Sequence, residues 1–281
     1  MKNKKLHDTG RSNLKRALTY EAVIFDLDGV ITDTAKVHAL TWKVMLDDYL
    51  EKRSIDLNKD FHPFSIENDY PAYVDGKPRY DGICSFLQSR GITLTYGNSN
   101  DDPEQDTVCG LSNRKNRIFS DMLNQHGVEV FESTVRLIRE LKAVGTLCGV
   151  VSSSKNCQRV LRIAGIEDLF LKRVDGVVSV ELNLKGKPNP DIFLKCAELM
   201  KVEANKSVVV EDAISGVAAG RDGRFGLVIG IDRMDISERL RENGADVVIP
   251  DFLNVSPNDI DKWYFTKNKT SNEVSNGNLS D

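Results

Sequence analysis

The stretch "AVIFDLDGVITDT", Ala22 to Thr34, decides the fold. Its first residues are continuously apolar and do not alternate, which predicts a strand buried on both faces. Asp26, Asp28 and Gly29 follow, and such residues are common in a solvated turn. An EF-hand loop is excluded, because counting from Asp26 the sixth residue is not Gly and the twelfth, Val37, is not Glu. A catalytic role for the two aspartates requires partners elsewhere in the chain.

Further short apolar runs, each bounded by turn residues, predict more strands of the same buried kind. They are "LCGVVSS" (147–153), "VVVED" (208–212), "GLVIGID" (226–232) and "DVVIP" (246–250). Stretches with helical periodicity lie between them, at 133–145, 154–166 and 191–200. Strands that alternate with helices predict an α/β fold, a doubly wound, Rossmann-like parallel sheet with helices on both faces.

One long block interrupts this alternation after the first strand. Residues 34–126 have helical periodicity but no comparable apolar strand. We therefore expect an inserted, mainly helical cap at 34–126 and an α/β core formed by 19–33 and 127–255. The polar ends predict a disordered extension at 1–18 and a C-terminal tail at 256–281 that is largely disordered from about residue 266.

The composition excludes several classes of partner. The 281 residues carry a net charge of -4, which gives no broad positive field for nucleic acid, and the basic run "NRKNR" (113–117) is typical of a solvated helix face. No apolar segment approaches the roughly 18 residues of a membrane span. The five cysteines are widely spaced and odd in number, as in a reduced cytoplasmic protein. We expect a cytoplasmic monomer that binds neither nucleic acid nor membrane.

Polar residues follow the predicted strands where each strand ends. Asp26 and Asp28 follow the first strand, Ser152 follows "GVV", and Glu211 and Asp212 follow "VVV". The carboxyl ends of parallel strands form the ligand-binding edge of an open sheet. Lys187, in the proline-rich stretch "KGKPNPD", could point its ammonium group toward the same edge. The sequence thus predicts four carboxylates, a hydroxyl and an ammonium group at one site.

Four neighbouring carboxylates require a cation, because a like-charged pair ~4 Å apart costs about 4 kcal/mol even at an effective dielectric constant of 20. All-oxygen ligation with room for water and phosphate favours Mg²⁺, and no Cys/His spacing indicates zinc. Mg²⁺ beside a carboxylate, a lysine and a serine suits phosphoryl transfer through an aspartyl phosphate. Asp28, two residues after the attacking Asp26, could serve as general acid and base.

These residues resemble the motifs of the haloacid dehalogenase superfamily, and within it the beta-phosphoglucomutase-like phosphotransferases. The four matching motifs occur in the expected order, as "DLDGVITD" (26–33), "VVSSS" (150–154), "KPNPD" (187–191) and "VVVEDAISG" (208–216). The resemblance implies that Asp26 is the nucleophile and Asp28 the acid/base residue. It also implies that Asp26, the backbone carbonyl of Asp28 and Asp212 hold Mg²⁺, with Glu211 supporting bound water.

The resemblance extends to residues that would bind the substrate. "DTAKVHALTW" (33–42) resembles the mutase hinge, so Thr34 and His38 would couple cap closure to Asp28, and Trp42 and the cap residue Gly76 would line the substrate site. A second phosphate site would be formed by Arg79, Lys115, Ser154, Lys155 and Asn156. Such a site implies isomerisation of beta-glucose 1-phosphate to glucose 6-phosphate through glucose 1,6-bisphosphate.

Two departures from the mutase pattern leave other functions open. Asp75 precedes Gly76 where a lysine is usual, the lysine being Lys77, and the stretch 93–110 lengthens the cap. Because the cap selects the substrate, a sugar-phosphate phosphatase is the alternative to a mutase. A phosphate-binding protein without catalysis is a third possibility, which no residue directly supports.

Overall fold

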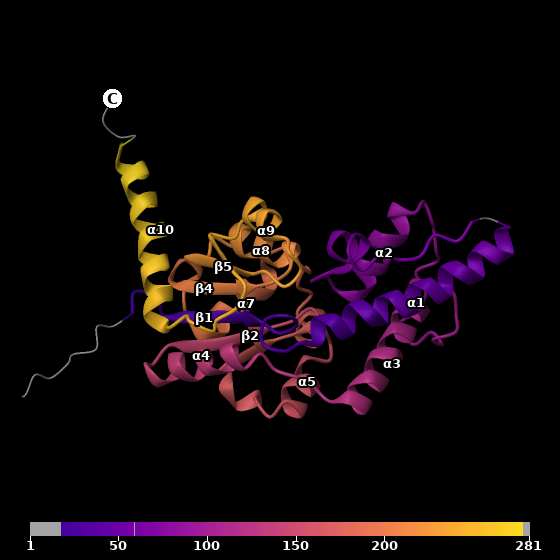
Figure 1. Ribbon diagram of the computed structural model, residues 1–281, viewed down its shortest axis with the longest axis horizontal. Helices are drawn as coiled ribbons and strands as arrows, with labels where there is room; N and C mark the ends of the chain where they lie inside the picture. Colours follow the sequence, from indigo (N-terminus) through magenta and orange to yellow (C-terminus); the bar gives the residue numbers. More distant parts are fainter. Residues whose placement is uncertain (1–17, 59, 278–281) are drawn as a thin grey trace, which may run out of the picture.

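The computed structural model describes residues 18–58 and 60–277 of the chain. Six parallel strands form one sheet in the order β3-β2-β1-β4-β5-β6 (Figure 1). The strands are β1 (Ala22–Asp26), β2 (Leu147–Val151), β3 (Lys172–Val174), β4 (Ser207–Glu211), β5 (Leu227–Ile231) and β6 (Val247–Ile249). The α/β fold class expected from the sequence is confirmed, and the strand that decides it, β1, lies between β2 and β4.

Helices cover both faces of the sheet, because alternate residues of each central strand point to opposite sides. Val23 and Phe25 of β1 belong to one apolar cluster, Ala22 and Ile24 to the other. The first cluster is covered by α4 (Glu132–Ala143), α5 (Cys157–Ile163) and α10 (Pro257–Gly277). The second is covered by α7 (Asp191–Met200), α8 (Ile214–Asp222) and α9 (Ser237–Asn243). Short helices complete the core: η2 (Glu167–Leu169), α6 (Gly176–Glu181) and η3 (Ala204–Lys206).

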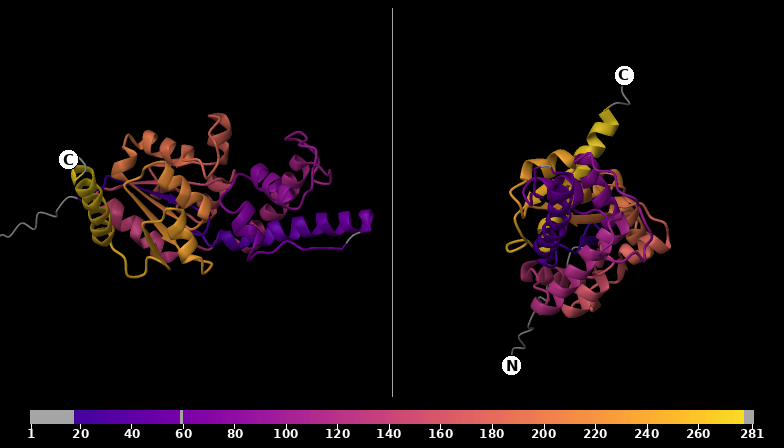
Figure 2. Two further views of the ribbon diagram at one scale, coloured as in Figure 1. Left: turned by 90° about the horizontal axis from the view of Figure 1, so that it is seen from above. Right: turned by 90° about the vertical axis from the view of Figure 1, so that its right-hand side faces the viewer.

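A separate helical unit lies beyond the carboxyl edge of the sheet (Figure 2). It contains α1 (Thr34–Leu57), the π-helix η1 (Tyr70–Val74), α2 (Arg79–Ser89) and α3 (Val108–His126). Most of its buried apolar residues form a third cluster drawn from 39–111, whereas Phe119 and Leu123 of α3 belong to the first cluster. We call this unit the cap. The backbone N–H of Asp33 donates to the carbonyl of Glu129 at 2.9 Å, so the two segments that join cap and core lie side by side.

Where the sequence predicted a C-terminal tail, the described residues form a helix, α10, that continues to Gly277. Ser256 precedes the helix, Pro257 is its first residue, and the Asp259 carboxylate accepts the Ser256 hydroxyl at 2.6 Å, which together form a strong helix start. Lys267 pairs with Asp246 at 2.6 Å and fixes the helix to the core. These polar contacts add to the apolar packing of Ile260, Trp263 and Tyr264 against the first cluster. Residues 1–17 and 278–281 lie outside the described residues.

Two further expectations from the sequence concern the ends and the surface. Leu18, the last residue of the expected disordered extension, packs against the first apolar cluster. The basic run 113–117 is not a solvated face, since Arg114 and Lys115 are buried; Arg114 pairs with Asp48 at 3.1 Å.

The described cysteines are free thiols. Within the described ranges, no helix combines the length and apolarity needed to cross a bilayer.

Candidate active site

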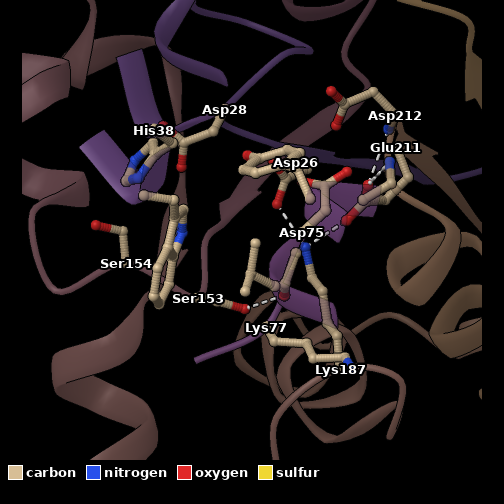
Figure 3. Close-up of a pocket in the computed structure, with 15 residues that line it drawn as sticks. Asp26, Asp28, His38, Asp75, Lys77, Ser153, Ser154, Lys187, Glu211 and Asp212 are labelled. Atoms are coloured by element: carbon tan, nitrogen blue, oxygen red, sulfur yellow. Dashed lines mark hydrogen bonds and ion pairs between the residues drawn. The ribbon is translucent and has the colours of Figure 1, made fainter. Parts of the chain in front are cut away.

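A cavity of about 60 Å³ lies where the carboxyl edge of the sheet meets the cap (Figure 3). The core contributes polar side chains from the ends of its strands and from the loop before α7, and the cap contributes residues of α1 and of the segment after η1. The residues from the core include Asp26, Asp28, Ser154, Lys187, Glu211 and Asp212; those from the cap include His38, Trp42, Tyr70, Asp75, Gly76 and Lys77.

Three carboxylates meet at one side of this cavity. Oxygens of Asp26, Glu211 and Asp212 lie within 4.8 Å of one another. Lys187, which is buried, donates to Asp26 Oδ1 at 2.5 Å and also to Glu211 Oε1. The second oxygen of Glu211 accepts the backbone N–H groups of Asp212 and Ala213, each at 2.8 Å. Glu211 is thereby fixed, while Asp26 and Asp212 present oxygens to the cavity.

The charges of this cluster are only partly balanced. Burial raises the pKa of Asp26 well above its usual range; the Lys187 charge opposes the shift and the Glu211 carboxylate adds to it. Burial also raises the pKa of Asp212, as do the nearby carboxylates of Asp75 and Glu211. One ammonium group therefore does not offset the carboxylates around it. A hard divalent cation with oxygen ligands fits this donor set.

A glycine allows the loop after β1 to pass close to the carboxylate cluster. Gly29 has φ of +86°, and a Cβ atom there would overlap the carboxylate of Asp212. Its N–H donates to the carbonyl of Thr32 at 2.8 Å, which closes the turn between β1 and α1. This turn gives Asp28 a direction different from that of Asp26.

Three side chains hold Asp28 in place. Thr34 donates to its Oδ1 at 2.5 Å and Ser152 to its Oδ2 at 3.0 Å, while His38 Nε2 lies 3.3 Å from Oδ1. Thr34 and His38 are four residues apart in the first turns of α1 and so lie on one face. Burial raises the pKa of Asp28, but His38 and the hydrogen bonds from Thr34 and Ser152 lower it below its usual value.

A buried lysine of the cap determines how His38 is protonated. Lys115 Nζ lies 2.6 Å from His38 Nδ1 and packs over the rings of Trp42 and Phe119. Burial lowers the pKa of His38, and the Lys115 charge lowers it further. When Lys115 donates to Nδ1, the ring proton resides on Nε2 and faces Asp28.

The residues expected to form a second phosphate site do not lie together: three of them line two adjoining cavities, and Lys115 and Asn156 line neither. Ser154 lines the first cavity, whereas Arg79 and Lys155 line an adjoining one of about 970 Å³. The Arg79 guanidinium donates to the carbonyl of Ser112 at 3.2 Å, and Lys155 lies over the Tyr80 ring. Asn156 donates its amide to Asn116 of α3 at 2.9 Å. Lys77, Ser153 and Lys187 line both cavities, which therefore share a wall.

Asp75 lies closer to the carboxylate cluster than sequence reasoning suggested. Burial raises its pKa to about 7, and the charge of Glu211 adds to the shift. The sequence identified Asp75 only as a departure from a mutase pattern. Its position directly before Gly76 was the available signal that it enters the site. No comparable signal marked Ser153 or Ser215, whose contacts with the cap are described below.

Comparisons with known proteins agree with this fold. A family model described as haloacid dehalogenase-like hydrolase matches residues 20–223. A beta-phosphoglucomutase of Mycobacterium bovis is 46% identical over 233 residues, which cover 82% of this chain and 89% of the relative. A beta-phosphoglucomutase of Bacillus subtilis is 34% identical, with coverages of 82% and 88%.

The fold also matches solved structures. A crystal structure of a beta-phosphoglucomutase from Clostridium difficile has a TM-score of 0.69 at 22% identity and covers 88% of this chain and 98% of its own. At that identity the match bears on the fold alone. Together with the curated relatives, it confirms the resemblance expected from the four motifs. The chain belongs to the family of haloacid dehalogenase-like hydrolases.

Proposed function

We propose that this enzyme is a beta-phosphoglucomutase, which converts beta-glucose 1-phosphate to glucose 6-phosphate through glucose 1,6-bisphosphate. Phosphoryl transfer is supported by the buried Asp26, 2.5 Å from Lys187, and by Asp28, which three side chains contact. The mutase outcome is supported by the similarity to relatives of that name. Two curated relatives with this name cover more than four fifths of the chain. A cytoplasmic location fits the free cysteines.

The first half-reaction transfers a phosphoryl group to Asp26. A carboxylate oxygen of Asp26 attacks phosphorus while the bond from phosphorus to the sugar oxygen breaks. Asp28 donates a proton to the departing sugar oxygen. Lys187 reduces the repulsion between the Asp26 carboxylate and the incoming phosphate dianion.

In the second half-reaction the phosphoryl group leaves Asp26 for another sugar oxygen. Asp28, now a carboxylate, accepts the proton of the acceptor hydroxyl as that oxygen attacks phosphorus. Phosphorylated Asp26 that meets the 6-hydroxyl of beta-glucose 1-phosphate forms the bisphosphate. The bisphosphate then turns and returns its 1-phosphate to Asp26, which releases glucose 6-phosphate. Arg79, Ser154, Lys155 and Asn156 are proposed to bind the phosphate that is not transferred.

Mg²⁺ is the cofactor we propose. Asp26, Asp212 and the backbone carbonyl of Asp28 would hold it, with Glu211 supporting bound water. The donor set supports this assignment, because three carboxylates lie within 4.8 Å of one another and Lys187 pairs with only two of them. The bound ion would supply positive charge to the phosphoryl oxygens.

A sugar-phosphate phosphatase remains the second candidate. The buried carboxyl group of Asp75 favours it, since the mutases that the sequence resembles have a lysine before the corresponding glycine. A carboxylate at this position could orient a water molecule toward phosphorylated Asp26. The two candidates share the first half-reaction and differ only in the acceptor.

A ³¹P NMR time course separates the candidates. Purified protein is incubated with Mg²⁺, beta-glucose 1-phosphate and a trace of glucose 1,6-bisphosphate. The proposal expects glucose 6-phosphate to grow as the substrate disappears. Growth of free phosphate alone would contradict it and identify a phosphatase. No turnover of this or any other sugar phosphate would favour a phosphate-binding protein.

A further inference from the structure

Two serines of the core hold two successive peptide groups of the cap. Ser153 Oγ donates to the carbonyl of Gly76 at 2.6 Å, a bond drawn in Figure 3. Ser215 Oγ donates to the carbonyl of Asp75 at 2.9 Å. Ser153 follows β2, whereas Ser215 lies at the start of α8 after β4. The cap segment is therefore bound from two sides of the cavity.

The backbone of this segment fits the two serines closely. Gly76 has φ of +69°, and a Cβ atom there would overlap Ser215 Oγ. Two residues later, Pro78 approaches Gly186 of the core so closely that a Cβ atom on Gly186 would overlap the Pro78 ring. A side chain at either glycine would prevent this contact. The cap and the core thus meet through main chain at the rim of the cavity.

The three core segments that carry Ser153, Ser215 and Gly186 also carry residues of the proposed reaction. Ser153 follows Ser152, which donates to Asp28. Ser215 lies three residues after Asp212, and Gly186 directly precedes Lys187. Closing the cap onto these segments therefore fixes the positions of the reacting groups at the same time.

We propose that Ser153 and Ser215 form a latch that keeps the cap closed over phosphorylated Asp26 until a sugar hydroxyl, and not water, accepts the phosphoryl group. The inference rests on the proposed mutase reaction and deepens it. Both serines are positioning residues, because they act through the cap and contact no reacting atom. Two bonds between neutral groups are weak enough to break in each turnover, which the exchange of substrate requires.

The latch predicts how phosphoryl transfer from Asp26 is divided between two acceptors, water and the sugar. Water competes with the sugar only when the cavity is open. The double variant Ser153→Ala/Ser215→Ala should increase the ratio of free phosphate to glucose 6-phosphate by about tenfold or more, since two net hydrogen bonds are lost. The control is Ser89→Ala, which removes a 2.7 Å bond from a serine hydroxyl to the Phe86 carbonyl inside the cap. Its ratio should equal that of the wild type.

Hydrogen exchange of the segment 70–78 gives a readout that does not depend on the reaction. Faster exchange in the double variant than in Ser89→Ala, together with the raised phosphate ratio, would support the latch. An unchanged ratio in the double variant, or a loss of both products without a change in their ratio, would overturn it. If the wild type releases only phosphate, the mutase proposal fails; faster exchange then still supports the latch as a closure device, and equal exchange overturns it.

Discussion

Asp28 is held by three other side chains, and its proposed role as general acid and base depends on how they hold it. Its hydrogen bonds to Thr34 and Ser152 fix both oxygens, and His38 closes the third side. The hydrogen bonds favour the carboxylate, which is the form that accepts a proton from a sugar hydroxyl. An incoming phosphate dianion adds negative charge beside it and favours the protonated form that donates to a leaving oxygen.

Replacing Asp28 by Asn should slow phosphoryl transfer by about 10²- to 10⁴-fold, the usual worth of general acid–base catalysis. The amide keeps the size of the side chain but cannot accept or release the proton. Asp33→Asn is the matched control, because Asp33 lies in the same loop and pairs with Lys36 on the surface at 2.7 Å. Rates are compared by single-turnover kinetics. Near-normal transfer by Asp28→Asn would refute the acid–base assignment.

Sequence reasoning located the site residues that lie at the end of a strand or directly after it. Asp26, Ser152 and Glu211 end or follow neighbouring strands, so their meeting follows from a parallel sheet. Ser153 and Ser215 could not be located in the same way. Their partners are backbone carbonyls of the cap, and only the fold brings those carbonyls to the core.

The strands were predictable where the sequence has a continuous apolar run. The five apolar runs correspond to β1, β2, β4, β5 and β6. The missed strand, β3, is the three-residue edge strand "KRV", which has too few apolar residues for a pattern. Helix α10 was missed for a related reason, because its residues beyond Phe265 are mostly polar, although Ile260 and Tyr264 near its start pack against the core.

The capping of α10 makes a prediction about stability. The hydrogen bonds from Lys262 and Ser256 lower the pKa of Asp259 to about 2. A lowered pKa in the folded state stabilises the protein above the unfolded value of ~3.9, and this contribution is lost as the pH falls through about 2. Asp259→Asn should reduce the free energy of unfolding at pH 7 by about 1 kcal/mol.

Urea unfolding of the wild type and Asp259→Asn measures this effect at several pH values. The difference between the two proteins should shrink as the pH is lowered from 4 toward 2. Asp56→Asn, a change at an exposed position of α1, is the control and should leave stability unchanged. A difference for Asp259→Asn that is absent at pH 7, or that grows with acid, would contradict the capping role.

The whole molecule consists of a sheet whose carboxyl edge faces a cap with its own apolar cluster (Figure 2). This arrangement was predictable because the cap interrupts the α/β pattern after its first strand. The contacts that close the cap over the site were not, since they join residues about 80 and 140 positions apart.

Mg²⁺ should stabilise the whole molecule, since it would offset the repulsion among Asp26, Glu211 and Asp212. A ligand at 100 times its Kd raises the free energy of unfolding by about 2.7 kcal/mol. Thermal unfolding with Mg²⁺ and with excess chelator measures the increment. It should shrink in Asp212→Asn, where a carboxylate of the site is missing. An equal Tm with and without Mg²⁺ would contradict the proposed metal site.

Transfer of the phosphoryl group to Asp26 is tested most directly by mass spectrometry. The protein is incubated with Mg²⁺ and glucose 1,6-bisphosphate, quenched in acid and digested with trypsin, which releases residues 17–36 as one peptide. We predict that this peptide gains the mass of one phosphoryl group, placed on Asp26 by fragmentation, and that Asp26→Asn shows no gain. A phosphoryl group on any other residue, or an Asp26→Asn variant that still transfers phosphate, would contradict the assignment.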